Sequence, residues 1–185
     1  GMLSGASNFT SNTMKATLKC IGKKANQSII SSFFIMVLQD RQFGEDGVLF
    51  YADCGVIPNP TAEQLSDIAI QTADSFVKLM GKTPRVAMLS FSTKGSAKHA
   101  DVDKVATATA LANTKRPEIV LDGEMQFDAA LIPQIGKRKA PQSPVAGQAN
   151  ILIFPDLDAG NIGYKITERL AHAQAFGPLF QGTAK

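Results

Sequence analysis

The chain has 185 residues, 44% of them hydrophobic and 19% charged, which is typical of a globular protein with one substantial core. The net charge of +3 is spread along the chain, with one short basic cluster at residues 137–139, and this pattern argues against nucleic-acid binding. No apolar run approaches the roughly 18 residues of a membrane span, no secretory signal is visible, and the two cysteines lack metal-type spacing. We therefore expect a protein of the reducing cytoplasm.

The first fifty residues predict one helix and two strands. Residues 10–24 carry apolar side chains at helical spacing and predict the helix. Residues 29–38 form a continuous apolar run, rich in β-branched and aromatic side chains, which predicts a buried strand. A polar connection leads to a second strand at residues 48–52, which we expect to pair antiparallel with the first.

The remaining chain alternates helices and strands. Thr61 and Gln64 have the spacing of a capping box and open a long amphipathic helix that ends near Gly81. Further strands are predicted at residues 85–90, 119–121 and 150–154, and further helices at residues 101–115, 125–132 and 162–175. Alternating elements with fully apolar strands predict an α/β protein whose sheet is covered on both faces. The early strand pair predicts that this sheet is mixed.

Ligands in such folds bind in loops beyond the carboxyl ends of the strands. The loop at residues 90–96 contains hydroxyls, a lysine and a glycine, and predicts an anion cradle. Its candidate binding residues are Ser92, Thr93, Lys94 and Ser96. The order of residues is not that of a phosphate-binding Walker A loop, and taken alone the composition of this loop favours an ordinary connection.

A second loop leads from residue 154 into a helix. Asn161 is the expected cap of this helix, with Tyr164 and Lys165 in the first turn. A lysine near a helix N-terminus opposes the helix dipole, which indicates another role for Lys165. The alternative is a lysine that is simply solvated.

Acidic residues mark a third loop, with Asp122, Glu124 and Asp128 close together. Acid–base chemistry is one interpretation, but acids at a helix start are common, and we favour the latter. No Ser-His-Asp triad can be assembled, because His99 lies in a polar lysine-rich stretch and His172 near the end of a predicted helix.

These loops belong to a series of motifs that resembles one enzyme family. The motifs are VAMLSFSTKGSA at residues 86–97, LDGEMQFDAAL at 121–131, residues 139–171, FGPLFQG at 176–182, and the SGA segment at 4–6 with its following helix. In this order they resemble the phosphate acetyltransferases and phosphate butyryltransferases. The resemblance extends to ethanolamine-utilisation acetyltransferases and to the acetyltransferase-like region of some malic enzymes.

The resemblance implies a three-layer mixed sheet like that of isocitrate and isopropylmalate dehydrogenases. Such proteins have two α/β domains with an active cleft between them and usually form homodimers. In that arrangement residues 1–25 would be a remnant of the first domain, residues 26–179 the second domain, and residues 180–185 the return to the first.

The resemblance also implies the reaction and its substrates. The thiol of coenzyme A, deprotonated by an enzyme carboxylate, attacks acetyl phosphate, and neither a metal nor a prosthetic group takes part. Ser4, Gly5 and Lys15 would then join the loop residues in binding substrate. Lys15 stands where many members have an arginine, so the charge is kept but the bidentate fork is lost.

The family's catalytic serine, arginine and acidic base are expected beyond residue 185, so we expect these residues alone to be inactive. Two alternatives stay open. The parent enzyme could prefer butyryl groups, or the domain could be a non-catalytic module of a malic enzyme that senses acyl coenzyme A.

Overall fold

One six-stranded sheet forms the centre of the molecule. The computed structural model describes residues 3, 5, 7–25 and 28–184, and the strand order is β4-β3-β5-β2-β1-β6. The strands are β1 (Ser31–Val37), β2 (Val48–Ala52), β3 (Arg85–Leu89), β4 (Val120–Met125), β5 (Ile151–Ile153) and β6 (Gln174–Gln181). Strands β4, β3, β5 and β2 are parallel, whereas β1 runs antiparallel to both β2 and β6. The predicted mixed sheet and the predicted antiparallel pair are therefore confirmed.

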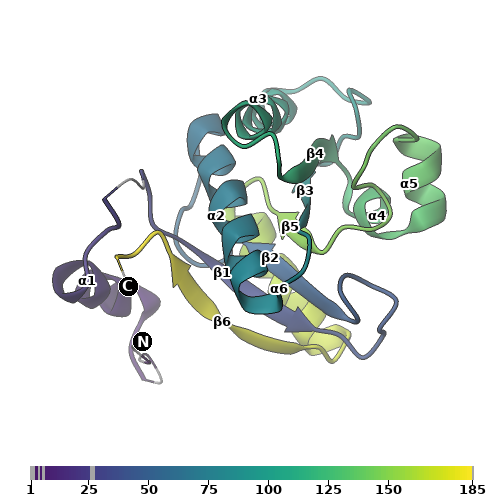
Figure 1. Cartoon of the computed structure of the whole chain (residues 1–185). Helices are drawn as coiled ribbons and strands as arrows, with labels where there is room; N and C mark the ends of the chain where they lie inside the picture. Colours follow the sequence, from purple (N-terminus) through teal and green to yellow (C-terminus); the bar gives the residue numbers. More distant parts are fainter. Residues whose placement is uncertain (1–2, 4, 6, 26–27, 185) are drawn as a thin grey trace.

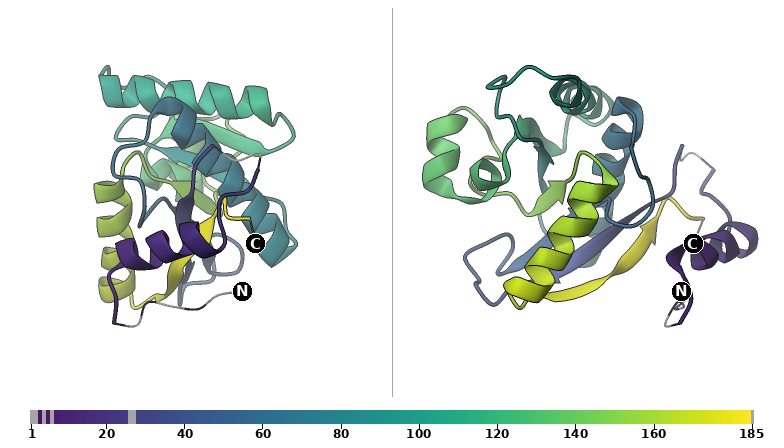
Figure 2. Two further views of the ribbon diagram at one scale, coloured as in Figure 1. Left: turned by 90° about the vertical axis from the view of Figure 1, so that its left-hand side faces the viewer. Right: turned by 180° about the vertical axis from the view of Figure 1, so that it is seen from behind.

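Helices cover both faces of the sheet and give three layers (Figures 1 and 2). α2 (Ala62–Met80) and α3 (Ala100–Lys115) pack on one face, while α4 (Phe127–Leu131) and α6 (Leu157–Leu170) contribute to the core on the other. α5 (Pro133–Lys139) packs beside α4. α1 (Thr10–Cys20) lies apart from these layers, beyond the β6 edge. No helix in the described ranges is both long and apolar enough to cross a bilayer.

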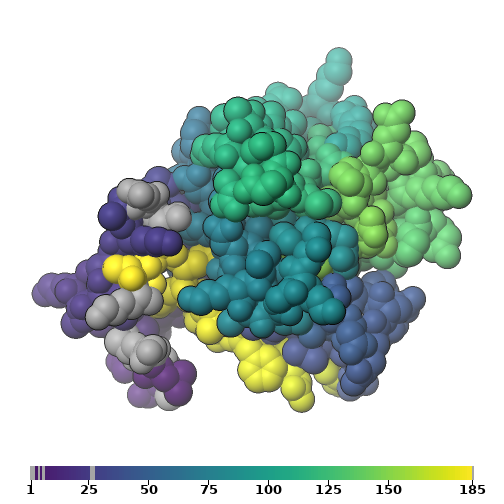
Figure 3. Space-filling view, in the orientation of Figure 1, coloured from purple at the N-terminus to yellow at the C-terminus, as the bar shows by residue number. Residues whose placement is uncertain are grey.

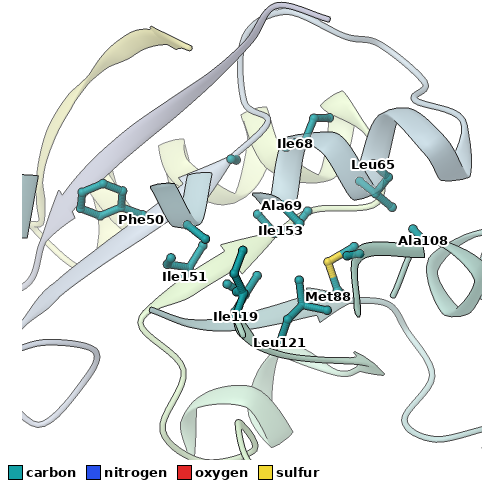
Figure 4. Packing of buried hydrophobic residues seen from close by; sticks show 14 of the residues in the cluster. Phe50, Leu65, Ile68, Ala69, Met88, Ala108, Ile119, Leu121, Ile151 and Ile153 are labelled. Carbon is teal, nitrogen blue, oxygen red and sulfur yellow. The ribbon is translucent and has the colours of Figure 1, made fainter. Parts of the chain in front are cut away.

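Strict alternation along the strands produces the two cores, because successive side chains of a strand point to opposite faces. In β3, Val86 and Met88 belong to the core under α2 and α3, whereas Ala87 and Leu89 belong to the other core. Figure 4 shows the first of these cores, where strand residues such as Met88 lie against apolar side chains of the helices.

The β1–β6 edge is less well covered than the rest of the sheet. Phe176 and Leu179 of β6 are 53% and 38% exposed. Their cross-strand partners are Ile35 and Phe33, which place them on the same face as α2. This edge therefore presents apolar side chains to the surface.

Two segments far apart in the sequence run side by side next to this edge. Lys23 forms an isolated bridge with Thr183, and the Lys24 amide donates to the Gly182 carbonyl over 3.0 Å. These contacts lie close to both proposed domain boundaries. The division of the chain at residues 25 and 180 stays a prediction.

The predicted helix at residues 162–175 was placed too late in the sequence. α6 begins at Leu157 because the Asp156 carboxylate accepts a hydrogen bond from the Ala159 amide (2.8 Å) and caps the helix. Asn161 is therefore not the cap, and Tyr164 and Lys165 do not lie in the first turn. The last two residues of the predicted helix, at 174 and 175, belong instead to β6, which was missed because its Gly-Pro pair is typical of a turn. An edge strand tolerates this pair, since its outer side needs no backbone donor.

The single helix predicted at residues 125–132 is two helices. Ile132 adopts an extended backbone (φ −96°, ψ 112°), as residues before proline prefer, and α5 starts at Pro133. Two other elements differ in length. The strand predicted at residues 119–121 continues to Met125, and the helix predicted at residues 10–24 ends at Cys20.

α2 has the capping box that the sequence predicts. The Thr61 hydroxyl accepts from the Gln64 amide (3.3 Å), and the Gln64 side chain accepts from the Thr61 amide (3.0 Å). Gly81 ends the helix in the left-handed conformation, at φ 62°. Within the helix, the hydroxyl of the fully buried Ser66 has no hydrogen-bond partner among the described residues.

We therefore expect Ser66→Ala to raise the free energy of unfolding by about 1 kcal/mol, because it removes an unsatisfied buried hydroxyl. Urea denaturation would measure this change. Thr72→Ala is the matched control on the same helix, since the Thr72 hydroxyl donates to the Ile68 carbonyl (2.7 Å) and accepts from Gln181 (2.8 Å). The control should lose about 2 kcal/mol. Equal destabilisation by both changes would contradict the expectation.

Candidate functional site

The three loops that the sequence singles out follow β3, β4 and β5. Because these strands are parallel neighbours, their carboxyl ends lie at the same end of the sheet. Open α/β sheets bind ligands at this end, beyond the carboxyl ends of their strands. The loop after β2 joins them there, since β2 is parallel to β5.

Most hydroxyls of the predicted anion cradle are bonded inside the protein. The Ser92 hydroxyl is fully buried and donates to the Glu124 carboxylate (2.9 Å), which also accepts from the Gly95 amide (2.7 Å). The Ser96 hydroxyl accepts from the Thr93 amide (3.0 Å). These bonds fasten the loop to the end of β4.

Thr93 makes a similar internal connection. Its hydroxyl accepts from the Gln126 amide (2.9 Å) and donates to the Gln126 side chain (3.3 Å). Of the four cradle residues, Ser92 and Thr93 are therefore buried, while Lys94 and Ser96 remain exposed. Sequence analysis did not identify Glu124 as the anchor of this loop, because its partners lie about thirty residues earlier.

Lys94 lines a hollow of about 540 Å³ at the end of β4 and α5, which we call the lysine hollow. Its ammonium group pairs with the Asp122 carboxylate and donates to the Gly123 carbonyl (2.8 Å). Lys139 lines the same hollow and pairs with Asp128 (3.0 Å). The acids interpreted as helix-start residues, Asp122 and Asp128, are thus partners of lysines.

The candidate residues on α6 form a second group. Asn161 donates to the Cys54 carbonyl (3.1 Å), and Lys165 donates to the Asn161 side chain (2.7 Å). The Tyr164 ring stacks on Phe34, with 4.1 Å between ring centroids. Burial against this ring raises the pKa of Tyr164, so its hydroxyl stays protonated at neutral pH. Lys165 is exposed and has its ammonium group fixed by Asn161.

A buried carboxylate organises the loop that meets α6. Asp53 is 3% exposed, and its carboxylate accepts five hydrogen bonds at the end of β2. The donors include the Ser32 hydroxyl (2.6 Å) on β1 and the amides of Gly55 (3.0 Å), Val56 (3.2 Å) and Ile57 (2.9 Å). Sequence analysis missed this role, although an acid directly after an apolar strand is a signal that could have indicated it.

Two glycines allow this loop to lie close to its neighbours. A Cβ atom at Gly160 of α6 would lie 2.3 Å from the Asp53 carbonyl oxygen, so only glycine fits there. A Cβ atom at Gly55 would lie 3.1 Å from the Ser32 hydroxyl of β1, which is a tight contact, and 3.5 Å from Pro178 of β6. Cys54 lies next to Gly55 in this loop. Burial raises the pKa of its thiol well above the usual value, and the nearby Asp53 carboxylate raises this pKa further. Cys54 is thus buried in the way that a small apolar side chain would be.

A different hollow, of about 440 Å³, lies between α1, α2, β1 and β6, and neither Gly5 nor Lys15 lines it. We call it the apolar hollow, because its lining includes apolar side chains such as Phe33 and Leu179. Thr13 and Thr17 of α1 also line it. In the space-filling view, the C-terminal segment is visible here between α1 and α2 (Figure 3).

Among the first-domain candidates, Gly5 has φ 107° and lies near Thr13, where a Cβ atom would be 3.4 Å from the Thr13 hydroxyl. Lys15 is exposed and, by helical periodicity, lies on the side of α1 opposite to Thr13 and Thr17. Ser4 lies outside the described residues.

The predicted residues therefore form three groups rather than one pocket. The two hollows have no lining residue in common, and the strand order places them near opposite edges of the sheet. Across the described ranges, no three His, Cys, Asp or Glu side chains gather as a metal site would require. The assignment of these residues to substrate binding stays a prediction.

The mixed sheet, covered by helices on both faces, defines a three-layer α/β domain. Its polar loops lie at the carboxyl ends of the parallel strands, where such domains bind ligands. The particular family follows from comparison with known proteins. The family model for phosphate acetyl/butaryl transferase matches residues 1–185, and the chain belongs to this family.

Individual relatives agree with the family model. The chain is 51% identical over 185 residues to a phosphate acetyltransferase of Acetivibrio thermocellus, and 53% identical over 182 residues to one of Thermoanaerobacterium thermosaccharolyticum. These matches include 100% and 98% of the chain but 56% of each relative. The crystal structure of a phosphotransacetylase from Streptococcus pyogenes matches with a TM-score of 0.92 at 46% identity, over 100% of this chain and 55% of that one. The chain thus spans about half the length of these relatives.

We expect Asp53→Ala to lower the free energy of unfolding by about 3 kcal/mol, because it leaves several buried donors without their charged acceptor. Chemical denaturation followed by circular dichroism would measure the loss. Asp40→Ala is a suitable control, since the Asp40 carboxylate is exposed and bonds only within its own turn, to Gln42. A stability of Asp53→Ala equal to that of the control would refute the anchoring role.

Proposed function

We propose that this chain provides the second domain of a phosphate acetyltransferase, which interconverts acetyl-CoA and phosphate with CoA and acetyl phosphate. The observation that carries the proposal is identity of about half of all residues, over the full chain, to relatives named for this activity. The family description covers both acetyl and butyryl transfer, and the names of these relatives favour acetyl.

The proposed chemistry needs positioning and charge stabilisation rather than a cofactor. Coenzyme A is a substrate, its thiol is deprotonated by a carboxylate, and the attack on acetyl phosphate proceeds without a metal or prosthetic group. We assign substrate contacts to Asn161, Tyr164 and Lys165 on α6, and to Gly5 and Lys15 near α1. The prearranged ammonium group of Lys165 supports this assignment, because a fixed donor loses little freedom on binding.

Other predicted contacts receive narrower roles. Ser4 is proposed to bind substrate with Gly5. Ser92, Thr93 and Ser96 are proposed to act by holding their loop and the neighbouring Lys94 in place. The apolar hollow has a volume within the range of small-molecule sites, and its mixture of apolar side chains and threonine hydroxyls would suit the pantetheine arm of coenzyme A.

We also propose that the complete enzyme is a cytoplasmic homodimer. The outer side of α6 exposes Ile162 (56%), Ile166 (53%) and Leu170 (76%) at a spacing of four residues. Such a continuous apolar stripe on a helix suits contact with another protein surface.

The 185 residues alone should show no CoA-dependent formation of acetyl phosphate, because the family's catalytic serine, arginine and base are expected outside them. A chimera in which they replace the matching residues of the Acetivibrio thermocellus enzyme should be active. A coupled assay of acetyl phosphate formation would measure both. Activity of the isolated chain, or a folded but inactive chimera, would contradict the proposal.

In that chimera, Lys165→Ala should raise the KM of at least one substrate about tenfold, which corresponds to the loss of one charge-assisted contact. The value of kcat should change little. Lys82→Ala, at an exposed turn after α2, is the matched control. Unchanged KM values for both substrates would remove Lys165 from the site.

A further inference from the structure

The lysine hollow brings together two cations from distant parts of the chain. Lys94 comes from the loop after β3 and Lys139 from the end of α5, and both line the same space of about 540 Å³. Neither lies in the apolar hollow. The lysine hollow therefore needs its own explanation.

Both ammonium groups are held in place by β4 and by the residue that follows it. Lys94 donates to the Gly123 carbonyl over 2.8 Å, and Lys139 donates to the Gln126 side chain over 2.8 Å. Gln126 is itself fixed by two hydrogen bonds with Thr93. Because these side chains are already ordered, a ligand that binds them would cost little additional entropy.

The local charge is positive. α5 ends in Lys137, Arg138 and Lys139, and Lys94 adds a fourth cation, whereas the carboxylates paired with these lysines are those of Asp122 and Asp128. A favourable interaction with the helix dipole explains why cations occur in the last turn of α5. It does not explain why the Lys139 ammonium group bonds to Gln126, in the hollow that Lys94 also lines. Lys137 and Arg138 do not line the hollow, but their charges on the same turn of α5 add a positive potential around it that attracts anions.

The walls and the volume indicate what kind of anion would fit. Ala140, Pro141 and Pro144 form an apolar wall, and Gln142 and Ser143 add polar atoms. A volume of about 540 Å³ lies within the range of sites for small organic ligands and is much larger than a bare phosphate needs. A ligand with a phosphate at one end and an organic body at the other would use both parts of the hollow.

We propose that the lysine hollow binds a small phosphate ester. Its phosphate lies between the ammonium groups of Lys94 and Lys139 and displaces part of their contacts with Asp122 and Asp128. The organic part packs over residues 140–144. This inference goes beyond acetyl transfer and does not rest on it, because the binding depends only on this hollow.

The test is a titration of the 185-residue chain with glycerol 3-phosphate at constant ionic strength. Calorimetry would measure the affinity, and amide NMR shifts would show which residues are affected. Saturable binding with shifts at residues 94 and 139–144 is expected. Lys94→Ala and Lys139→Ala should each weaken binding about tenfold or more, as expected for loss of a charge-assisted contact. Lys137→Ala is the matched control, since Lys137 lies on the same turn of α5 but does not line the hollow.

Two further probes separate the parts of the ligand. Inorganic phosphate should bind about tenfold more weakly than the ester, because it lacks the glycerol part whose carbons and hydroxyls contact residues 140–144. Glycerol should not bind. Circular dichroism would check the fold of each variant, and Lys139→Gln would replace Lys139→Ala if the alanine variant were unfolded.

Absence of saturable binding by the unchanged chain would overturn the proposal. So would equal weakening by Lys137→Ala and Lys139→Ala, which would show only a diffuse charge effect. Equal affinity for inorganic phosphate would overturn the organic part of the assignment. None of these outcomes measures acetyl transfer, so failure here is distinguishable from failure of the chimera assay.

Discussion

The arrangement of this domain depends on a buried carboxylate at the end of β2. Asp53 accepts hydrogen bonds from β1 and from the following loop, at a depth where an unpaired charge would be strongly unfavourable. Because the charge must be satisfied, the amides of residues 55–57 converge on it and the loop has one conformation. α6 then packs against the loop at Gly160, and β6 approaches it at Pro178. One carboxylate thus connects β1, which runs antiparallel to both of its neighbours, to the helix that carries Asn161, Tyr164 and Lys165.

The other half of the sheet uses the same principle. Glu124 is 5% exposed, and one of its oxygens accepts from the Ser92 hydroxyl and the Gly95 amide. Asp53 and Glu124 both lie near the end of a strand, and the carboxylate of each accepts more than one hydrogen bond from a loop. These bonds hold the loop against the sheet. The loops at the carboxyl ends of the strands are therefore held by internal hydrogen bonds. Such preorganisation lowers the entropic cost of recognition.

Local signals in the sequence were sufficient for much of the fold. The capping box of Thr61, the alternation of β3 and the apolar run that forms β1 each determine an element through neighbours in the sequence. The errors have a physical cause in competition between local signals. Asp156 and Asn161 were both suitable caps, and the structure uses the earlier one. β6 contains Gly177 and Pro178, and only its pairing with β1, more than a hundred residues away, makes that pair part of a strand.

The candidate site was harder to predict, because a motif identifies a family without separating contact residues from supporting ones. Ser92, Glu124 and Gly177 all lie in motifs that carry the resemblance, yet each has a structural role. Ser92 and Glu124 bond to each other, and a Cβ atom at Gly177 would lie 2.6 Å from the Phe34 ring. Phe34 in turn stacks on Tyr164, so even this glycine influences the position of α6. Much of the motif sequence is therefore accounted for by internal contacts that hold the loops and α6 in place, while Lys94 and Lys165 in the same motifs are exposed.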